Sequence, residues 1–156
     1  MEKTKKILTN ILLVFALLSI GVAVGKHLAK PEQQASLVPN ASGHQVAVYY
    51  LHSTFRCETC NTIESMTREL LETSYGDELA AGKVLWIEED FQKNEALAKR
   101  FEVVASCVVV VEMKEGVIAD YTRLDDVWIW MSEPRAFNLY IGEAIDAYLE
   151  RIKDPS

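Results

Sequence analysis

The sequence predicts an α/β domain, a mixed β-sheet flanked by helices, that follows an apolar N-terminal segment. Short apolar runs rich in β-branched residues alternate with amphipathic stretches of helical period, as in strands joined by helices. A Cys-x-x-Cys pair lies where the first apolar run gives way to the first amphipathic stretch. Farther along, two apolar runs separated by Lys114-Glu115-Gly116 have the pattern of a β-hairpin.

The chain has 156 residues, a net charge of −7 and a hydrophobic fraction of 49%. This length suits one ordinary domain together with an N-terminal extension. The acidic balance argues against nucleic acid as a partner. The three cysteines are too few for a disulfide framework, and their odd number leaves one thiol outside any pair.

The N-terminal segment has the length of a membrane-spanning helix. Residues 7–25 contain no charged side chain, and about 20 apolar residues are needed to cross a bilayer as a helix. Small residues at positions 23–25 permit the alternative of a cleaved signal peptide. We favour an uncleaved anchor because the apolar run is long for a signal-peptide core.

The predicted organisation has three parts. Residues 1–25 form a transmembrane anchor or signal segment, residues 26–45 a flexible stalk rich in Pro, Gln and Ser, and residues 46–156 the folded domain. Lysines flank the apolar segment on both sides, which gives a modest preference for a cytoplasmic N-terminus. Either interpretation places the domain in the periplasm or at the cell exterior, where disulfides persist.

The first half of the domain reads as strand, helix, strand, helix. The first strand is the apolar run 46–51, and the helix after the cysteines carries an apolar stripe and stops near Gly76. The run 84–87 is typical of a strand covered on both faces. Asn94 is suited to cap a helix over 94–101. Two strands separated by a helix predict a parallel pair.

The second half of the domain reads as a hairpin and a long helix. The hairpin strands span 108–113 and 117–121. The final helix begins near Pro134, a residue that suits a first helical turn, and continues with an apolar stripe. Trp128 and Trp130 precede this helix, and we interpret both as packing residues.

Cys57 and Cys60 are the candidate catalytic residues. Their spacing puts both sulfurs on one side of a first helical turn, close enough to form a disulfide. At the helix N-terminus, Cys57 faces unpaired backbone N–H groups and the positive end of the helix dipole, and Arg56 adds a neighbouring cation. We therefore predict that Cys57 is the nucleophile and that Cys60 resolves the mixed disulfide.

Two other interpretations of the pair remain open. The cysteines suit an inert structural disulfide, and a Cys-x-x-Cys is also half of a zinc site. The sequence holds no second Cys-x-x-Cys or His-x-His pair, so the metal alternative uses His52, Cys57, Cys60 and Cys107. We expect Cys107 beside the pair, where it would exchange with the disulfide, help to bind copper(I) or zinc, or simply fill space.

The order of elements, with a Cys-x-x-Cys opening the first helix, resembles the thioredoxin fold, a three-layer sandwich. The segment from His52 to Cys60, the helix at Asn94 and Trp128 resemble small bacterial thioredoxin-like proteins catalogued as a nitrophenyl-compound nitroreductase subunit family. The resemblance implies exchange with protein thiols or disulfides, or electron transfer to a larger oxidoreductase partner as an accessory subunit. The sequence carries no flavin or nicotinamide fingerprint, so no cofactor is expected.

Three positions depart from the thioredoxin pattern. Arg56 replaces the tryptophan before the first cysteine, Leu51 replaces a buried acid, and Cys107 replaces a cis-proline. The resemblance therefore implies an altered substrate-binding loop, with His52 or water as the general base for Cys60. The expected function is thiol–disulfide redox chemistry or electron transfer. The alternative is a non-enzymatic interaction or metal-binding module with a structural disulfide.

We predict that the folded domain lies outside the cytoplasm, because the apolar segment carries a basic flank on its N-terminal side. Protease added to intact spheroplasts should remove the domain from the membrane, while a cytoplasmic marker protein stays intact. A domain that survives until the membrane is disrupted would show that the topology is wrong.

Overall fold

The computed structural model describes residues 43–153. Its elements are β1 (His44–His52), α2 (Glu58–Ser74), α3 (Gly76–Ala80), β2 (Val84–Asp90), α4 (Glu95–Arg100), β3 (Cys107–Lys114), β4 (Val117–Leu124), α5 (Val127–Trp130) and α6 (Pro134–Lys153). The anchor predicted at 7–25 lies outside the described residues. Among the helices of residues 43–153, none is long and apolar enough to span a membrane.

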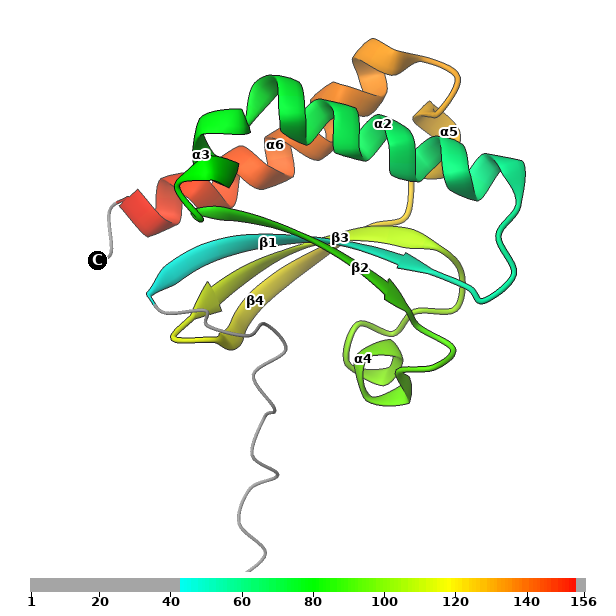
Figure 1. Cartoon of the computed structure of the whole chain (residues 1–156), viewed down its shortest axis with the longest axis horizontal. Coiled ribbons are helices and arrows are strands. Elements are labelled where there is room, and N and C mark those ends of the chain that lie inside the picture. The colour runs from blue at the N-terminus through cyan, green and yellow to red at the C-terminus, as the bar shows by residue number, and fades with distance from the viewer. Residues whose placement is uncertain (1–42, 154–156) are drawn as a thin grey trace, which may run out of the picture. The chain divides into compact units, whose positions relative to one another are not determined.

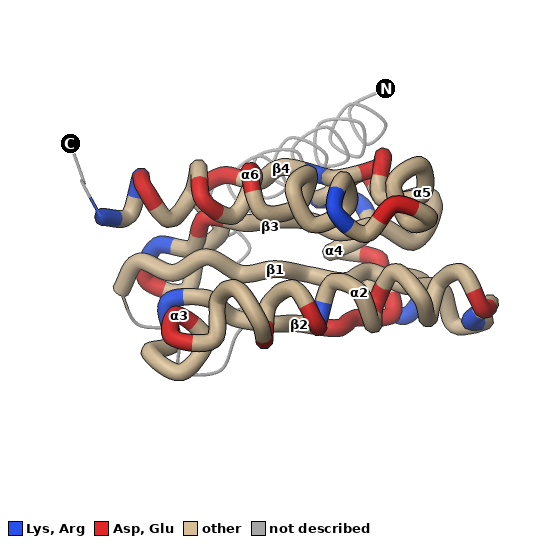
Figure 2. Tube along the Cα trace, turned by 90° about the horizontal axis from the view of Figure 1, so that it is seen from above, with Lys and Arg blue, Asp and Glu red and all other residues tan. Residues whose placement is uncertain are grey.

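A four-stranded sheet of order β2-β1-β3-β4 forms the middle layer (Figure 1). β1 and β2 are parallel, whereas β3 is antiparallel to both β1 and β4. Helices α2 and α6 lie beside each other over one face of the sheet, and α4 lies on the other face (Figures 1 and 2). The prediction of a mixed sheet flanked by helices is therefore confirmed, and its topology is that of a thioredoxin-like sheet.

β1 forms the centre of the core because it lies between two other strands and is covered on both faces. Successive side chains of a strand point to opposite faces of the sheet. Those of β1 divide into Val46, Val48 and Tyr50 toward α2 and α6, and Ala47, Tyr49 and Leu51 toward α4. None of these side chains is more than 1% exposed. A continuous apolar run is what a strand in this position requires.

Local sequence signals determine several element ends as predicted. Glu115 and Gly116, between β3 and β4, have φ of 51° and 75°, the left-handed backbone that tight hairpins favour. Asn94 caps α4, because its Oδ1 accepts a hydrogen bond from the backbone N–H of Leu97 at 3.1 Å. The last helix begins at Pro134.

β2 differs from its prediction as a strand covered on both faces. It lies at the edge of the sheet, and Leu85 and Trp86 are only partly buried. The strand also continues beyond the apolar run to Asp90, because Glu88 and Glu89 pair in register with β1. Position in the sheet, which a local apolar run does not encode, accounts for the difference. The short helices α3, which begins at Gly76 where a helix end was expected, and α5 were not predicted.

We predict that Ile141→Ala lowers the free energy of unfolding by about 2–5 kcal/mol, because Ile141 of α6 is fully buried against the sheet and its truncation leaves a cavity. The matched control is Leu139→Ala in the same helix, where the side chain is 63% exposed. This control should change stability by less than about 0.5 kcal/mol. Urea denaturation measures both, and equal losses would contradict the packing of α6.

Candidate functional site

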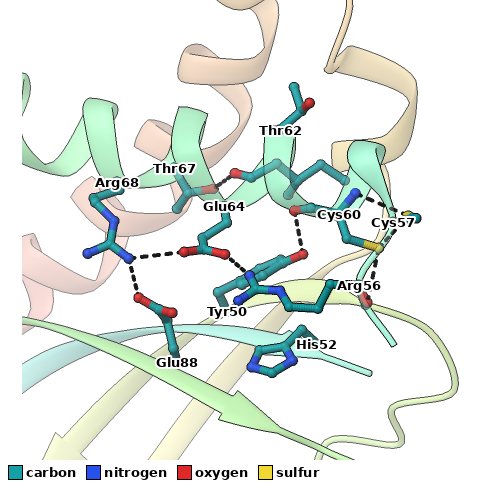
Figure 3. Close-up of polar contacts among 12 residues, drawn as sticks. Tyr50, His52, Arg56, Cys57, Cys60, Thr62, Glu64, Thr67, Arg68 and Glu88 are labelled. Carbon is teal, nitrogen blue, oxygen red and sulfur yellow. Dashed lines mark hydrogen bonds and ion pairs between the residues drawn. The ribbon is translucent and has the colours of Figure 1, made fainter. Parts of the chain in front are cut away.

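Cys57 and Cys60 lie where the loop after β1 enters α2 (Figure 3). Cys57 is the N-cap residue of the helix, and its Sγ accepts a hydrogen bond from the backbone N–H of Cys60 at 3.3 Å. The two Sγ atoms are 2.7 Å apart, and both cysteines are free thiols. Since a disulfide bond is about 2.05 Å long, a small movement of either side chain would bring the sulfurs to bonding distance when an oxidant accepts their two electrons.

The two sulfurs differ in their surroundings. Cys57 is partly exposed, whereas Cys60 is buried. Burial of Cys60 disfavours its thiolate, but hydrogen bonds from Cys57, from the backbone and from the Ser106 hydroxyl outweigh burial and lower the pKa of Cys60. The exposed sulfur is the one that a substrate can reach.

Arg56, expected as a cation beside Cys57, is directed toward α2 instead. Its guanidinium forms an ion pair with Glu64, and its Cζ lies 5.8 Å from the centre of the Tyr50 ring (Figure 3). The Tyr50 hydroxyl donates a hydrogen bond to the Cys60 carbonyl oxygen at 2.6 Å. Burial raises the pKa of Tyr50 to about 12, so this donor stays protonated. Arg56 therefore ties the loop to the helix, and Glu64 offsets its charge.

His52, the candidate general base, is the last residue of β1. Its Nδ1 lies 2.9 Å from the Ser53 carbonyl oxygen, and its ring centre is 6.0 Å from that of Tyr50. Among the described residues, no hydrogen bond joins His52 to either thiol. A direct proton transfer from Cys60 to His52 would require the ring to move.

The loop that carries Cys57 is held in place by the end of β2. The Thr54 hydroxyl donates to Asp90 Oδ2 at 2.7 Å, and the Thr54 N–H donates to Gln92 Oε1 at 2.9 Å. The hydrogen bond from Thr54, with further help from Lys93 and Gln92, lowers the pKa of Asp90 to about 2. Asp90 therefore remains a carboxylate that anchors the loop, a role that the sequence did not reveal.

The structure corrects the expectation that Cys107 lies beside the pair. Cys107 is paired with Leu51 in the sheet, and both side chains belong to the cluster on the α4 side. Cys107 is 2% exposed, and burial raises its pKa to about 12. The loop before β3 does reach the pair, but through Ser106, whose Oγ is 3.8 Å from Cys60 Sγ. Adjacent residues of an extended chain point to opposite sides, so only one of them can face the cysteines.

The metal site of His52, Cys57, Cys60 and Cys107 is likewise not assembled. Within residues 43–153, no group of three or more His, Cys, Asp or Glu side chains is arranged to hold a metal ion. Cys107 faces the other side of the sheet, and the His52 ring contacts the Ser53 carbonyl. These side chains therefore do not form a grouped metal site among the described residues.

Sequence reasoning missed the contact that positions Ser106. The indole Nε1 of Trp128 donates a hydrogen bond to the Ser106 carbonyl oxygen at 2.7 Å. Trp130, by contrast, packs against the core as expected. Two tryptophans two residues apart have different roles, and no signal in their spacing distinguishes them.

No protein-family model matches the chain, and no curated protein has a significant sequence match to it. Several solved structures are similar to it. A thioredoxin of Malassezia sympodialis has 19% identity and a TM-score of 0.42, with 66% of this chain and 77% of that chain covered. Mitochondrial thioredoxin 3 of Saccharomyces cerevisiae, in its oxidized form, has 18% identity and a TM-score of 0.40, with 66% and 78% covered. Fasciola hepatica thioredoxin has 19% identity and a TM-score of 0.37, with 60% and 82% covered.

We predict that Cys107 resists alkylation in the folded protein, because burial keeps its thiol protonated and covered. Iodoacetamide at neutral pH should label Cys57, while Cys107 should become labelled only after denaturation in urea. Peptide mass spectrometry assigns the labelled residues. Labelling of Cys107 in the native protein at the rate of Cys57 would contradict its placement.

Proposed function

We propose that this chain is a membrane-anchored, extracytoplasmic thiol–disulfide oxidoreductase that works through Cys57 and Cys60. The observation that carries the proposal is the 2.7 Å contact between the two sulfurs at the start of α2, with Cys57 partly exposed. A pair in this position stores two electrons as two thiols and releases them when the disulfide forms.

The reaction proceeds in two exchanges. The Cys57 thiolate attacks a disulfide of the substrate protein, forms a mixed disulfide and releases one substrate thiolate. Cys60 then attacks the Cys57 sulfur, releases the second substrate thiolate and leaves the Cys57–Cys60 disulfide. The substrate gains two electrons and the pair loses two. In the opposite direction, the same steps oxidise a dithiol substrate. The N-terminus of α2 stabilises negative charge on Cys57 when it acts as nucleophile or leaving group.

Exposed apolar side chains near the site support a protein substrate. Phe55, in the loop before Cys57, is 82% exposed, and Val104, in the loop before β3, is 92% exposed. Ile129 of α5 is 63% exposed. The loop of Phe55 carries Cys57, and the loop of Val104 carries Ser106, which contacts Cys60. Helix α5 is joined to this second loop by the hydrogen bond from Trp128 to the Ser106 carbonyl oxygen. Apolar groups around a reactive sulfur suit contact with a polypeptide.

The location and the partner extend this proposal. The apolar segment at 7–25 supports a single-pass membrane anchor. Export of the folded domain past this anchor would place Cys57 and Cys60 in a compartment in which disulfides persist. The resemblance to the nitroreductase subunit family supports a role as an accessory subunit, which passes electrons to a larger oxidoreductase. That partner would carry out the reduction of the nitro compound, because this sequence has no flavin or nicotinamide fingerprint.

The competing function is a non-enzymatic interaction module with a structural disulfide. Partial exposure of Cys57 and the lowered pKa of Cys60 favour exchange over this alternative. Reduction potential separates the two functions, because structural disulfides have potentials below about −300 mV.

We predict a potential above about −300 mV for the Cys57–Cys60 couple, measured by equilibration with dithiothreitol and thiol labelling. Cys57→Ser should abolish exchange, and Cys60→Ser should accumulate mixed disulfides with partner proteins, because the resolving thiol is absent. Cys107→Ala is the matched control and should keep the wild-type potential. A potential below about −300 mV, together with no mixed disulfide in Cys60→Ser, would identify the Cys57–Cys60 disulfide as purely structural.

A further inference from the structure

We propose that Ser106 and Trp128 position Cys60 for the resolving step: the Trp128 indole N–H fixes the Ser106 backbone, and the Ser106 hydroxyl stabilises the attacking Cys60 sulfur. This inference rests on the proposed function and deepens it, because it assigns positioning residues to one of its two exchanges. Neither residue was expected to act at the site from the sequence.

The Ser106 hydroxyl lies within hydrogen-bonding distance of the buried Cys60 sulfur. Ser106 is only 5% exposed, and its Oγ lies 3.8 Å from Cys60 Sγ, within the range for a hydrogen bond to sulfur. In the described part of the chain, the side chains that form hydrogen bonds with Cys60 Sγ are Cys57 and Ser106. Within residues 43–153, Ser106 therefore supplies the one hydroxyl group within hydrogen-bonding distance of the resolving thiol.

The importance of Ser106 increases during the reaction. In the mixed disulfide, the Cys57 sulfur is bonded to the substrate sulfur and has no proton to donate to Cys60. The Ser106 hydroxyl is then the remaining side-chain donor at the Cys60 sulfur among the described residues. It donates to the thiolate at the moment when Cys60 must attack, and hydrogen bonds to a charged group are stronger than those between neutral groups.

Trp128 determines where this hydroxyl lies. Its Nε1 donates to the Ser106 carbonyl oxygen at 2.7 Å across 22 positions of sequence. The helix that carries Trp128 is anchored independently, because Val127 is fully buried and Trp130 packs against the core. Trp128 itself is 37% exposed, so it contributes a specific donor as well as packing. Through this hydrogen bond α5, which is anchored in the core, holds the loop before β3.

The charged and titratable groups around Cys60 do not take over this role. On the β1 side, the Tyr50 hydroxyl is used on the Cys60 carbonyl oxygen. In the loop before α2, Arg56 is paired with Glu64 of the helix. From the loop before β3, the uncharged Ser106 hydroxyl contacts the Cys60 sulfur. Helix α5 acts on this loop through the hydrogen bond from Trp128 to the Ser106 carbonyl oxygen. His52, at the end of β1, forms no hydrogen bond with either thiol among the described residues. The pH profile of the second exchange therefore follows the Cys60 thiol, whose hydroxyl partner, Ser106, is uncharged.

The two exchanges are measured separately with the chromogenic disulfide dithiobisnitrobenzoate. When the reduced full-length protein in detergent is mixed with this reagent, Cys57 attack releases a first thionitrobenzoate and forms a mixed disulfide. Cys60 attack then releases a second thionitrobenzoate as the Cys57–Cys60 disulfide forms. Stopped-flow absorbance gives the rate of each release as a function of pH. A Cys107→Ala background removes the third thiol.

Ser106→Ala should slow the second release at neutral pH about threefold or more and shift its pH profile upward, with the first release unchanged. Trp128→Phe should act in the same direction, because it removes the N–H donor while keeping an aromatic ring. If Trp128 acts through Ser106, the double variant should be no slower than Ser106→Ala alone. Ser106→Thr retains a hydroxyl and should keep the wild-type pH profile.

Trp130→Phe and Ser65→Ala are the controls. Trp130 packs on the core and Ser65 is exposed on α2, so both should leave the second release unchanged. Thermal unfolding and the rate of the first release show that each variant is folded. If the second thionitrobenzoate is released at the wild-type rate in both Ser106→Ala and Trp128→Phe, this inference is overturned and the proposed function stays intact. A wild-type protein that never gives the second release overturns the proposed function and the inference together.

Discussion

The structure depends on the burial of β1 on both faces. As the strand alternates, Tyr50 points toward α2, where its hydroxyl bonds the Cys60 carbonyl oxygen, and Leu51 points toward the α4 side, beside Cys107. The strand ends at His52, and the loop that begins there reaches α2 within a few residues. One extended segment thus determines which cysteine belongs to the site and which belongs to the core.

The site itself is assembled from segments that are distant in sequence. Asp90, at the end of β2, holds the loop before the cysteines through Thr54. Ser106, before β3, contacts the buried sulfur, and Trp128 of α5 holds Ser106. These contacts fix the surroundings of a short loop whose own sequence contains few packing residues. Pre-positioned neighbours of this kind reduce the reorganisation that each exchange step needs.

A chain of charged side chains joins α2 to β2 (Figure 3). Arg68 contacts both Glu64 and Glu88, and Trp86 donates its indole N–H to Glu88 at 2.9 Å. Since Arg56 also pairs with Glu64, the network links the cysteine loop to the edge strand. Partly exposed ion pairs typically contribute about 0–1 kcal/mol each. The network therefore orients the helix more than it stabilises the fold.

Local patterns in the sequence predicted the order of the strands and of helices α2, α4 and α6, the hairpin turn and the N-cap at Asn94. They also predicted the start of the last helix at Pro134 and the place of Cys57 and Cys60 at the start of a helix. Those features depend on local patterns, because helix period, strand run and turn chemistry are encoded within a few neighbouring residues. Three other features depend on the tertiary structure: β2 lies at the edge of the sheet, Cys107 faces away from the pair, and Ser106 faces toward it.

The contact of Asp90 with the loop before α2 and the contact of Trp128 with the loop before β3 also depend on the tertiary structure. The physical reason is that strand order and register bring together residues that are far apart in sequence. A shift of one residue along a strand reverses the face on which a side chain lies. For Ser106 and Cys107, that single step separates a contact with the redox pair from a place in the opposite core cluster.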